Sequence, residues 1–242
     1  MDLIDALVPE SEGTPLVCVV GAGGKKTTLY TLSNALDRAV VTATVRIPIF
    51  DEHVGEVRVT DDPVDAVAAH DGPWPLGVVP EREDDRYLGY ETATVDALTE
   101  TDVDAVLVKA DGARMREFKA PDADEPRLPA ASTAVLPIAS VQVVGRPLTD
   151  DYVHRPERVA ALTDREVGDT VRAEDVATVL THPDGGCKGV PGDTTVVPVL
   201  NKVDDADWER TARTIARRIH ERADVPYVAL THLRGGDLVA VV

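Results

Sequence analysis

Apolar runs of strand length and amphipathic stretches of helical spacing follow one another along most of the chain. Strand-like runs cover residues 15–20, 39–44, 56–60, 75–80, 105–110, 133–137, 140–144, 195–200, 226–230 and 238–242. Helical patterns fall at about 2–7, 29–37, 63–70, 92–99, 172–182, after Arg155 and around 208–219. Strands that alternate with helices at this spacing imply βαβ units. The sequence therefore predicts an α/β fold, with a mainly parallel β-sheet flanked by helices, as one domain over residues 1–242.

Two charged stretches interrupt this pattern. Residues 81–90 are rich in acidic and basic side chains and predict a loop. Residues 114–129 hold four basic residues and three prolines, which keep the segment extended. A local basic patch would suit an anionic substrate, and ion pairs with the acidic residues of the same segment would explain it as well.

A glycine-rich turn joins the first predicted strand to the helix that follows. It reads Gly21-Ala22-Gly23-Gly24-Lys25-Lys26-Thr27-Thr28. Small residues let a backbone fold closely around phosphate oxygens, and the N–H groups at a helix start point at the anion. A lysine adds positive charge, and a threonine hydroxyl can hold Mg²⁺. The turn predicts a P-loop NTPase-like nucleotide site; the alternative is a simple β–α turn with two solvated lysines.

The spacing of the turn leaves two registers open. The common pattern G-x-x-x-x-G-K-[ST] requires one more residue between Gly21 and Lys26, whereas the shorter G-x-x-G-K-x-[ST] fits with Lys25 as the phosphate lysine. Either Lys25 neutralises phosphate charge, or Lys26 and Thr27 form the working pair. We take both lysines as catalytic candidates and Thr27 as a candidate Mg²⁺ ligand.

An aspartate follows another apolar strand, in Ala105-Val-Leu-Val-Lys-Ala-Asp111. A carboxylate at the end of a neighbouring strand is what a phosphate loop needs to support Mg²⁺. The Asp-Gly pair is also a common turn. Because a phosphate loop is also predicted, Asp111 is predicted to act in catalysis and in metal binding.

A second candidate motif ends the strand at 195–200 and reads Asn201-Lys202-Val203-Asp204. In such an arrangement the aspartate accepts from the ring N–H and the amine of guanine, a donor pair that adenine does not present. The lysine stem lies along the base, and the asparagine ties this loop to the phosphate loop. Asn201, Lys202 and Asp204 are therefore predicted to recognise guanine; the alternative is a solvated loop.

The net charge and composition of the chain exclude some classes of binding partner. A formal charge of −18 over 242 residues would repel the phosphates of nucleic acid or of an anionic membrane, so neither is expected as a partner. The first residues lack a basic leader and no apolar run is long enough to span a bilayer, so we expect a cytoplasmic protein. Arginine outnumbers lysine and acidic residues are abundant, as in proteins of halophilic, high-salt cytoplasms.

Several stretches together resemble the YqeC-like family of accessory proteins for selenium-dependent molybdenum hydroxylases. They are Val20-Gly-Ala-Gly-Gly-Lys-Lys-Thr-Thr, Ala110-Asp-Gly-Ala-Arg with Lys119-Ala-Pro, Val153-His-Arg-Pro-Glu, Lys188-Gly-Val-Pro and Asn201-Lys-Val-Asp. The resemblance spans almost the whole chain and implies a P-loop NTPase-like protein that helps to mature or insert a molybdenum cofactor. The chain carries Lys109 where the family more usually has glutamate.

These observations lead to a functional hypothesis. The protein is predicted to bind magnesium with GTP or ATP, to hydrolyse the nucleotide slowly, and to act on a molybdenum-dependent hydroxylase or its cofactor. One alternative is a non-catalytic binder that carries a pterin–nucleotide cofactor to an apo-enzyme. Another is an ATP-dependent ligase or kinase for a small molecule, which the shorter loop pattern favours.

Overall fold

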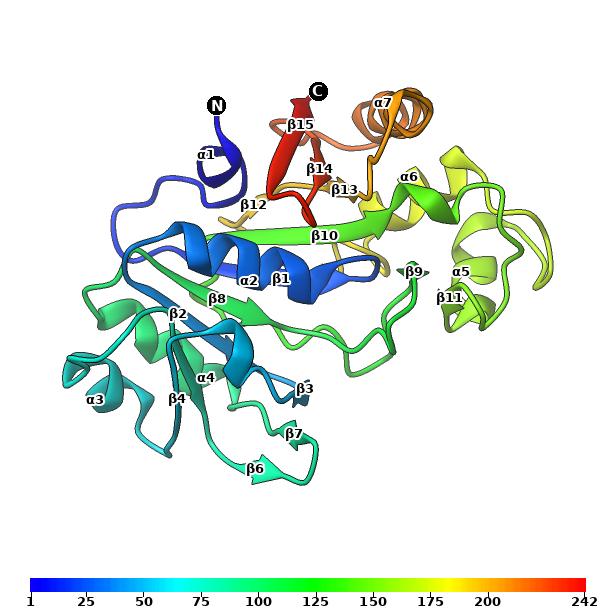
Figure 1. Ribbon diagram of the computed structural model, residues 1–242. Coiled ribbons are helices and arrows are strands. Elements are labelled where there is room, and N and C mark those ends of the chain that lie inside the picture. The colour runs from blue at the N-terminus through cyan, green and yellow to red at the C-terminus, as the bar shows by residue number, and fades with distance from the viewer.

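A ten-stranded sheet forms the centre of the computed structural model, which describes residues 1–242 (Figure 1). The strands run in the order β15 (Asp237–Val241), β14 (Ala229–His232), β13 (Val199–Asn201), β10 (Ala134–Ser140), β1 (Leu16–Gly21), β8 (Ala105–Lys109), β2 (Ala39–Ala43), β5 (Leu76–Val79) and β4 (Glu56–Val59). The short strand β12 (Thr195–Val196) also pairs with β10. All of these pairs are parallel except β14 with β15. The predicted α/β fold with a mainly parallel sheet is confirmed.

Helices cover both faces of the sheet because the strands are apolar on both faces. Along β1, Val17 and Val19 pack under α1 (Leu3–Leu7) and α2 (Lys25–Ala35). Leu16 and Cys18 face the opposite side, where α3 (Pro63–Ala68) and α4 (Thr92–Asp96) contribute to the core. The same side is covered further along by α5 (Pro156–Thr163), α6 (Ala173–Thr181) and α7 (Ala206–His220). This two-sided burial is typical of parallel sheets.

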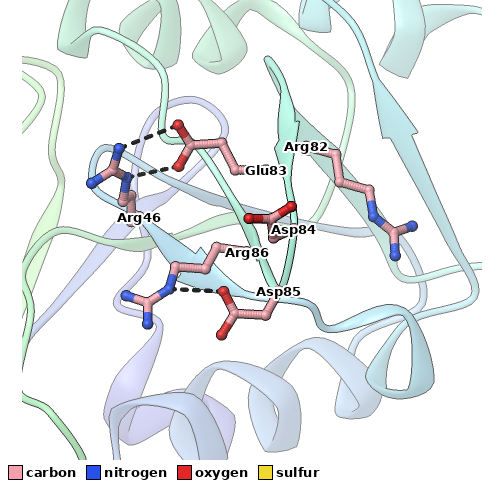
Figure 2. Close-up of a pocket in the computed structure, with 6 residues that line it drawn as sticks. All are labelled: Arg46, Arg82, Glu83, Asp84, Asp85 and Arg86. Atoms are coloured by element: carbon pink, nitrogen blue, oxygen red, sulfur yellow. Dashed lines mark hydrogen bonds and ion pairs between the residues drawn. The ribbon is translucent and has the colours of Figure 1, made fainter.

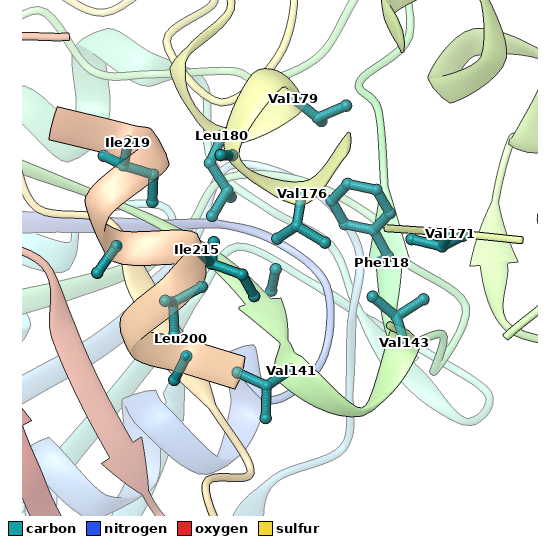
Figure 3. Close-up of a cluster of buried hydrophobic side chains, with 14 of the residues drawn as sticks. Phe118, Val141, Val143, Val171, Val176, Val179, Leu180, Leu200, Ile215 and Ile219 are labelled. Atoms are coloured by element: carbon teal, nitrogen blue, oxygen red, sulfur yellow. The ribbon is translucent and has the colours of Figure 1, made fainter. Parts of the chain in front are cut away.

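The cluster beneath α6 and α7 fixes the loops on one side of the candidate site. Figure 3 shows Ile215 and Ile219 of α7 beside Leu180 of α6, with Phe118 of β9 (Phe118–Lys119) reaching into the same cluster. Full burial of such side chains contributes about 1.5–3 kcal/mol each. Because successive residues of a strand point in opposite directions, the burial of Phe118 directs Lys119 away from this cluster. The strand is held in place by β11 (Val153–His154), which pairs with it.

The structure corrects two of the predicted elements. The apolar stretches at 133–137 and 140–144 are not two strands: β10 is continuous, and a short 3₁₀-helix follows at Val141–Val143. Pro137 is tolerated within β10 because it lies level with Pro198, where the neighbouring strand is interrupted between β12 and β13.

The charged stretch at 81–90 is not simply a loop. It forms the hairpin strands β6 (Arg82–Glu83) and β7 (Arg86–Tyr87), which extend to β3 (Ile47–Pro48). Tyr87 is buried and packs edge-on against Phe50, with 5.5 Å between ring centroids. Because most residues of the stretch are charged, the sequence pattern did not indicate that Tyr87 is buried.

Eight neighbouring strands of the sheet are parallel and end at the same edge, so the loops that follow them meet there. They are β14, β13, β10, β1, β8, β2, β5 and β4. In open α/β sheets ligands bind outside the carboxyl ends of the strands. All of the predicted site residues end or follow three of these strands, β1, β8 and β13. None of the helices combines the length and the apolar character that crossing a membrane requires.

Candidate functional site

The glycine-rich turn lies between the end of β1 and the start of α2, as predicted. Its first three N–H groups hold the turn in place: Gly21 donates to Asp111, Ala22 to the carbonyl of Ile138, and Gly23 to the carbonyl of Arg116. The next four N–H groups, those of residues 24–27, donate to no protein acceptor. They belong to the first turn of α2, where backbone donors lack helical partners. The turn therefore presents a set of free donors that can bind an anion.

Gly24 must be a glycine for two reasons. Its φ of 145° lies in a region that L-residues rarely adopt, and a Cβ would lie 2.1 Å from Nδ2 of Asn201. The turn and the Asn201 loop thus approach more closely than any side chain at position 24 would permit.

The two lysines of the turn have different environments. Lys25 is 5% exposed, and its ammonium donates back to the carbonyl of Gly21 and lies 2.7 Å from Oδ1 of Asp111. Lys26 is half-buried and has no carboxylate partner. The ammonium of Lys25 therefore lies against the turn, whereas that of Lys26 makes no hydrogen bond or ion pair with the protein. This geometry favours the register in which Lys25 is the phosphate lysine.

The threonines of the turn also differ. Thr28 is fully buried, and its hydroxyl donates to the carbonyl of Gly24 within the helix. The hydroxyl of Thr27 makes no hydrogen bond to the protein and is half-buried. Of the two, Thr27 is the one whose oxygen remains available to a metal ion.

Asp111 lies beneath the turn at the centre of a buried charge network. It is 1% exposed, accepts from the N–H of Gly21 at 2.8 Å, and pairs with Lys25 at 2.7 Å and Lys119 at 2.9 Å. Burial alone would raise the pKa of Asp111, but the two lysines outweigh burial and hold the pKa below its ordinary range. Asp111 is therefore ionised and neutralised by protein groups.

The network continues away from the turn through Lys119. Its ammonium lies 2.8 Å from Glu125, and Glu125 in turn lies 2.7 Å from Arg155. Burial would raise the pKa of Glu125, but Lys119 and Arg155 lower it to about 2. The basic segment 114–129 is thus partly explained by ion pairs, as one reading of the sequence predicted. Arg114 and Arg116 lie in the same segment without carboxylate partners.

Lys109, the last residue of β8, is the most isolated buried cation at this edge. It is 6% exposed, and its ammonium donates to the carbonyl of Arg46 at 2.7 Å. No carboxylate pairs with it. Burial lowers the pKa of Lys109 to about 7, and the nearby Lys25 adds to the shift. Sequence reasoning did not include Lys109 among the site residues, although its place at a strand end beside Asp111 was visible.

Asn201 joins the candidate base loop to the phosphate loop. Its amide donates to the carbonyl of Gly23 at 2.9 Å. Its oxygen accepts from the hydroxyl of Thr231 at 3.2 Å and from the N–H of Leu233 at 3.3 Å. Asn201 is 4% exposed, so these bonds are shielded from water. The tether expected of this asparagine is present, and it holds a third loop, the one after β14.

Asp204 and Lys202 lie at the more open end of the same loop. The Asp204 carboxylate is 44% exposed, accepts from Nε2 of Gln142 at 2.7 Å and lies 3.5 Å from Nε2 of His232. Lys202 has a left-handed φ of 65°, and its ammonium contacts both oxygens of Glu117, at 2.6 and 2.7 Å. Asp204 is thus oriented by neighbours and remains accessible. Gln142, His232 and Glu117 are contacts that the sequence did not reveal.

All the lysines of the chain gather at this edge of the sheet. Two lie in the turn, two lie beneath it, Lys188 donates to the carbonyls of Asp122 and Ala123, and Lys202 pairs with Glu117. The chain holds 25 lysine and arginine residues. The basic residues outside this edge are all arginines, and they include those of α7. The concentration of ammonium groups at one edge of a chain with a charge of −18 indicates a binding site for an anion.

A cavity lined by charged side chains is a separate feature. It has a volume of about 510 Å³ and lies between β3 and the β6–β7 hairpin (Figure 2). Only charged side chains line it, and four of the six form ion pairs: Arg46 with Glu83 at 3.0 Å and Arg86 with Asp85 at 3.2 Å. No residue of the phosphate loop lines the cavity. We therefore place the candidate site at the loop edge and not in this cavity.

Two comparisons relate the chain to known proteins. The sequence model of one family, described as YqeC protein, matches residues 17–157. The Uncharacterized protein YqeC of Escherichia coli (strain K12) is 27% identical over 199 residues, which cover 77% of this chain and 75% of that protein. The residues matched by the family model include the phosphate loop, Lys109, Asp111 and Lys119. They end before the Asn201 loop.

Proposed function

This chain belongs to the YqeC family, and we propose that it binds a magnesium–nucleotide, GTP in preference to ATP, at the edge formed by residues 21–28, 111 and 201–204. The observation that carries the proposal is the phosphate loop itself. Four consecutive free N–H groups and a buried lysine converge where a β-strand leads into a helix. Both kinds of donor can bind polyphosphate oxygens. The bonds from the lysine are the stronger ones because they are charge-assisted.

The preference for guanine is supported by the tether between the two loops. Asn201 fixes the base loop relative to the phosphate loop, and Asp204 presents an accessible carboxylate at its end. A carboxylate accepts from both guanine donors, and the pairing would be lost with adenine.

The residues present are chemically suited to Mg²⁺. Magnesium prefers oxygen ligands and is usually held by one or two protein oxygens together with phosphates and waters. Thr27 supplies a free hydroxyl, whereas both oxygens of Asp111 are engaged by Lys25, Lys119 and Gly21, so Asp111 would support the metal through the groups that it holds and not as a direct ligand. No group of three or more His, Cys, Asp or Glu side chains could hold a metal without the nucleotide. Bound magnesium would neutralise phosphate charge.

We propose that hydrolysis is slow. Lys25 would neutralise charge on the phosphates, which is the main demand of phosphoryl transfer. A fast hydrolase also needs a group to orient the attacking water. The nearest carboxylate, Asp111, is committed to Lys25 and Lys119, and its low pKa makes it a weak base. This same observation favours a second candidate function, a binder that carries a pterin–nucleotide cofactor without turning it over.

The biological role that we propose is accessory. The resemblance to accessory proteins of selenium-dependent molybdenum hydroxylases makes such an enzyme, or its molybdenum cofactor, the proposed partner. Nucleotide binding would then govern transfer of the cofactor. The acidic, arginine-rich composition suggests that the protein works at high salt, so binding experiments belong in high-salt buffer.

The proposal is tested by comparing nucleotide binding to Lys25→Met and Lys26→Met. Methionine keeps an unbranched stem and removes the charge. We expect Lys25→Met to weaken GTP binding tens- to thousands-fold, because a charge-assisted contact of about 2–5 kcal/mol is lost. Lys26→Met should have a smaller effect. Titration with fluorescent GTP, with competition by ATP and a pterin nucleotide, measures both. Unchanged affinity in folded Lys25→Met would reject the phosphate-loop assignment.

A further inference from the structure

We propose that Lys109 binds the terminal phosphate of the nucleotide and makes the site prefer a triphosphate over a diphosphate. This inference rests on the proposed nucleotide site and adds to it a residue outside the phosphate loop.

The first argument is the position of Lys109. It is paired in register with Val19 of β1 on one side and with Ala43 of β2 on the other. Leu107, two residues earlier on β8, packs under α2. Because alternate residues of a strand share a face, the Lys109 side chain lies on the α2 side of the sheet, beneath the helix start that carries the free N–H groups.

The second argument is the unmet demand of its ammonium group. Lys25 and Lys119, which are equally buried, each contact Asp111, whereas Lys109 contacts one backbone carbonyl, that of Arg46. An ammonium group has three N–H donors, so two of those of Lys109 have no acceptor in the protein. Burying a charge is costly unless it is paired. A phosphate oxygen arriving from the turn would supply the missing negative charge.

The third argument is the direction in which a nucleotide would lie. The base contacts follow β13 and β14, the phosphate turn follows β1, and Lys109 ends β8, the next strand in the same direction. Neighbouring strands are about 4.8 Å apart, so the axes of β13 and β1 are separated by about 10 Å and those of β1 and β8 by about 5 Å. A nucleotide with its base at Asp204 therefore extends its last phosphate past the turn and toward Lys109. A diphosphate would stop short of it.

The test compares GTP, a non-hydrolysable GTP analogue and GDP on wild type, Lys109→Gln and Lys109→Met. We expect both variants to bind GTP and its analogue 10- to 100-fold more weakly, and to bind GDP within threefold of wild type. Lys109→Met keeps the volume and removes the buried charge, so it keeps the test valid if Lys109→Gln fails to fold. Arg217→Gln, which removes an exposed charge on α7 that has no carboxylate partner, is the matched control and should bind as wild type does.

The outcomes separate this inference from the proposed function. If the wild type binds GTP and GDP and the variants lose both equally, or lose neither, the role of Lys109 is refuted and the nucleotide site stands. If the wild type binds no nucleotide, the proposed function itself is refuted, and the inference with it. A selective loss of the triphosphate supports both.

Discussion

Replacing Asn201 with alanine should destabilise the protein and uncouple the base loop from the phosphate loop. The side chain makes three hydrogen bonds: one to the carbonyl of Gly23, one from Thr231 and one from Leu233. Alanine would remove all three. Thr231 is fully buried and Asn201 is 4% exposed, so water cannot readily replace the lost partner.

The magnitude follows from those bonds. A hydrogen bond contributes about 1 kcal/mol net, and a buried group left without a partner costs about 1–3 kcal/mol. Three such groups, some of which relax toward other partners, give an expected loss of about 3 kcal/mol in the free energy of unfolding. The turn at Gly24 would also lose the amide against which it packs.

Urea unfolding followed by circular dichroism measures this loss. Asn34→Ala is a matched control, because the amide of Asn34 also donates to two carbonyls, those of Tyr30 and His53, but is exposed. The control should lose less than about 1 kcal/mol. If Asn201→Ala costs no more than Asn34→Ala, the tether does not hold the two loops together and the reasoning fails.

Two further predictions concern the charges beneath the turn. Asp111→Ala should cost about 3–5 kcal/mol in urea unfolding, because it leaves Lys25 and Lys119 buried without their carboxylate; a cost below about 1 kcal/mol would mean that the network does not stabilise the fold. Glu125→Gln tests pH dependence. Burial opposes ionisation of Glu125, but Lys119 and Arg155 bring its pKa to about 2 from an ordinary 4.5. Its ionised form therefore stabilises the fold above pH 4.5, by about 3 kcal/mol, and the difference between wild type and variant should shrink as the pH falls toward 2. A difference that stays constant across this range would contradict the assignment.

The sequence predicted much of this architecture because burial sets the spacing of apolar residues. Parallel strands buried on both faces appear as short apolar runs, and most of these runs became strands. The turn at 21–28, Asp111 and Asn201 could be assigned to strand ends for the same reason. Their convergence then follows from the geometry of a parallel sheet.

The contacts that complete the site could not be predicted, because they depend on the order of strands across the sheet. β10 lies between β1 and β13, and this order brings Glu117 to Lys202, 85 residues away in sequence. Lys119 reaches Asp111 because Phe118 is anchored in the opposite core, and such a two-residue strand has no recognisable pattern. The burial of Lys109 depends on the carbonyl of Arg46, which no local pattern indicates.

The measurement that tests the central proposal most directly is competition of GTP, ATP and XTP against a fluorescent nucleotide on wild type and Asp204→Asn. Wild type should prefer GTP, because the carboxylate of Asp204 can accept from both guanine donors. Asparagine replaces one acceptor oxygen with a donor amide, so Asp204→Asn should bind GTP more weakly and XTP more tightly, since the C2 oxygen of xanthine accepts from that amide. Equal affinity of the wild type for GTP and ATP would contradict guanine recognition, and an absence of binding to all three would contradict the nucleotide site itself.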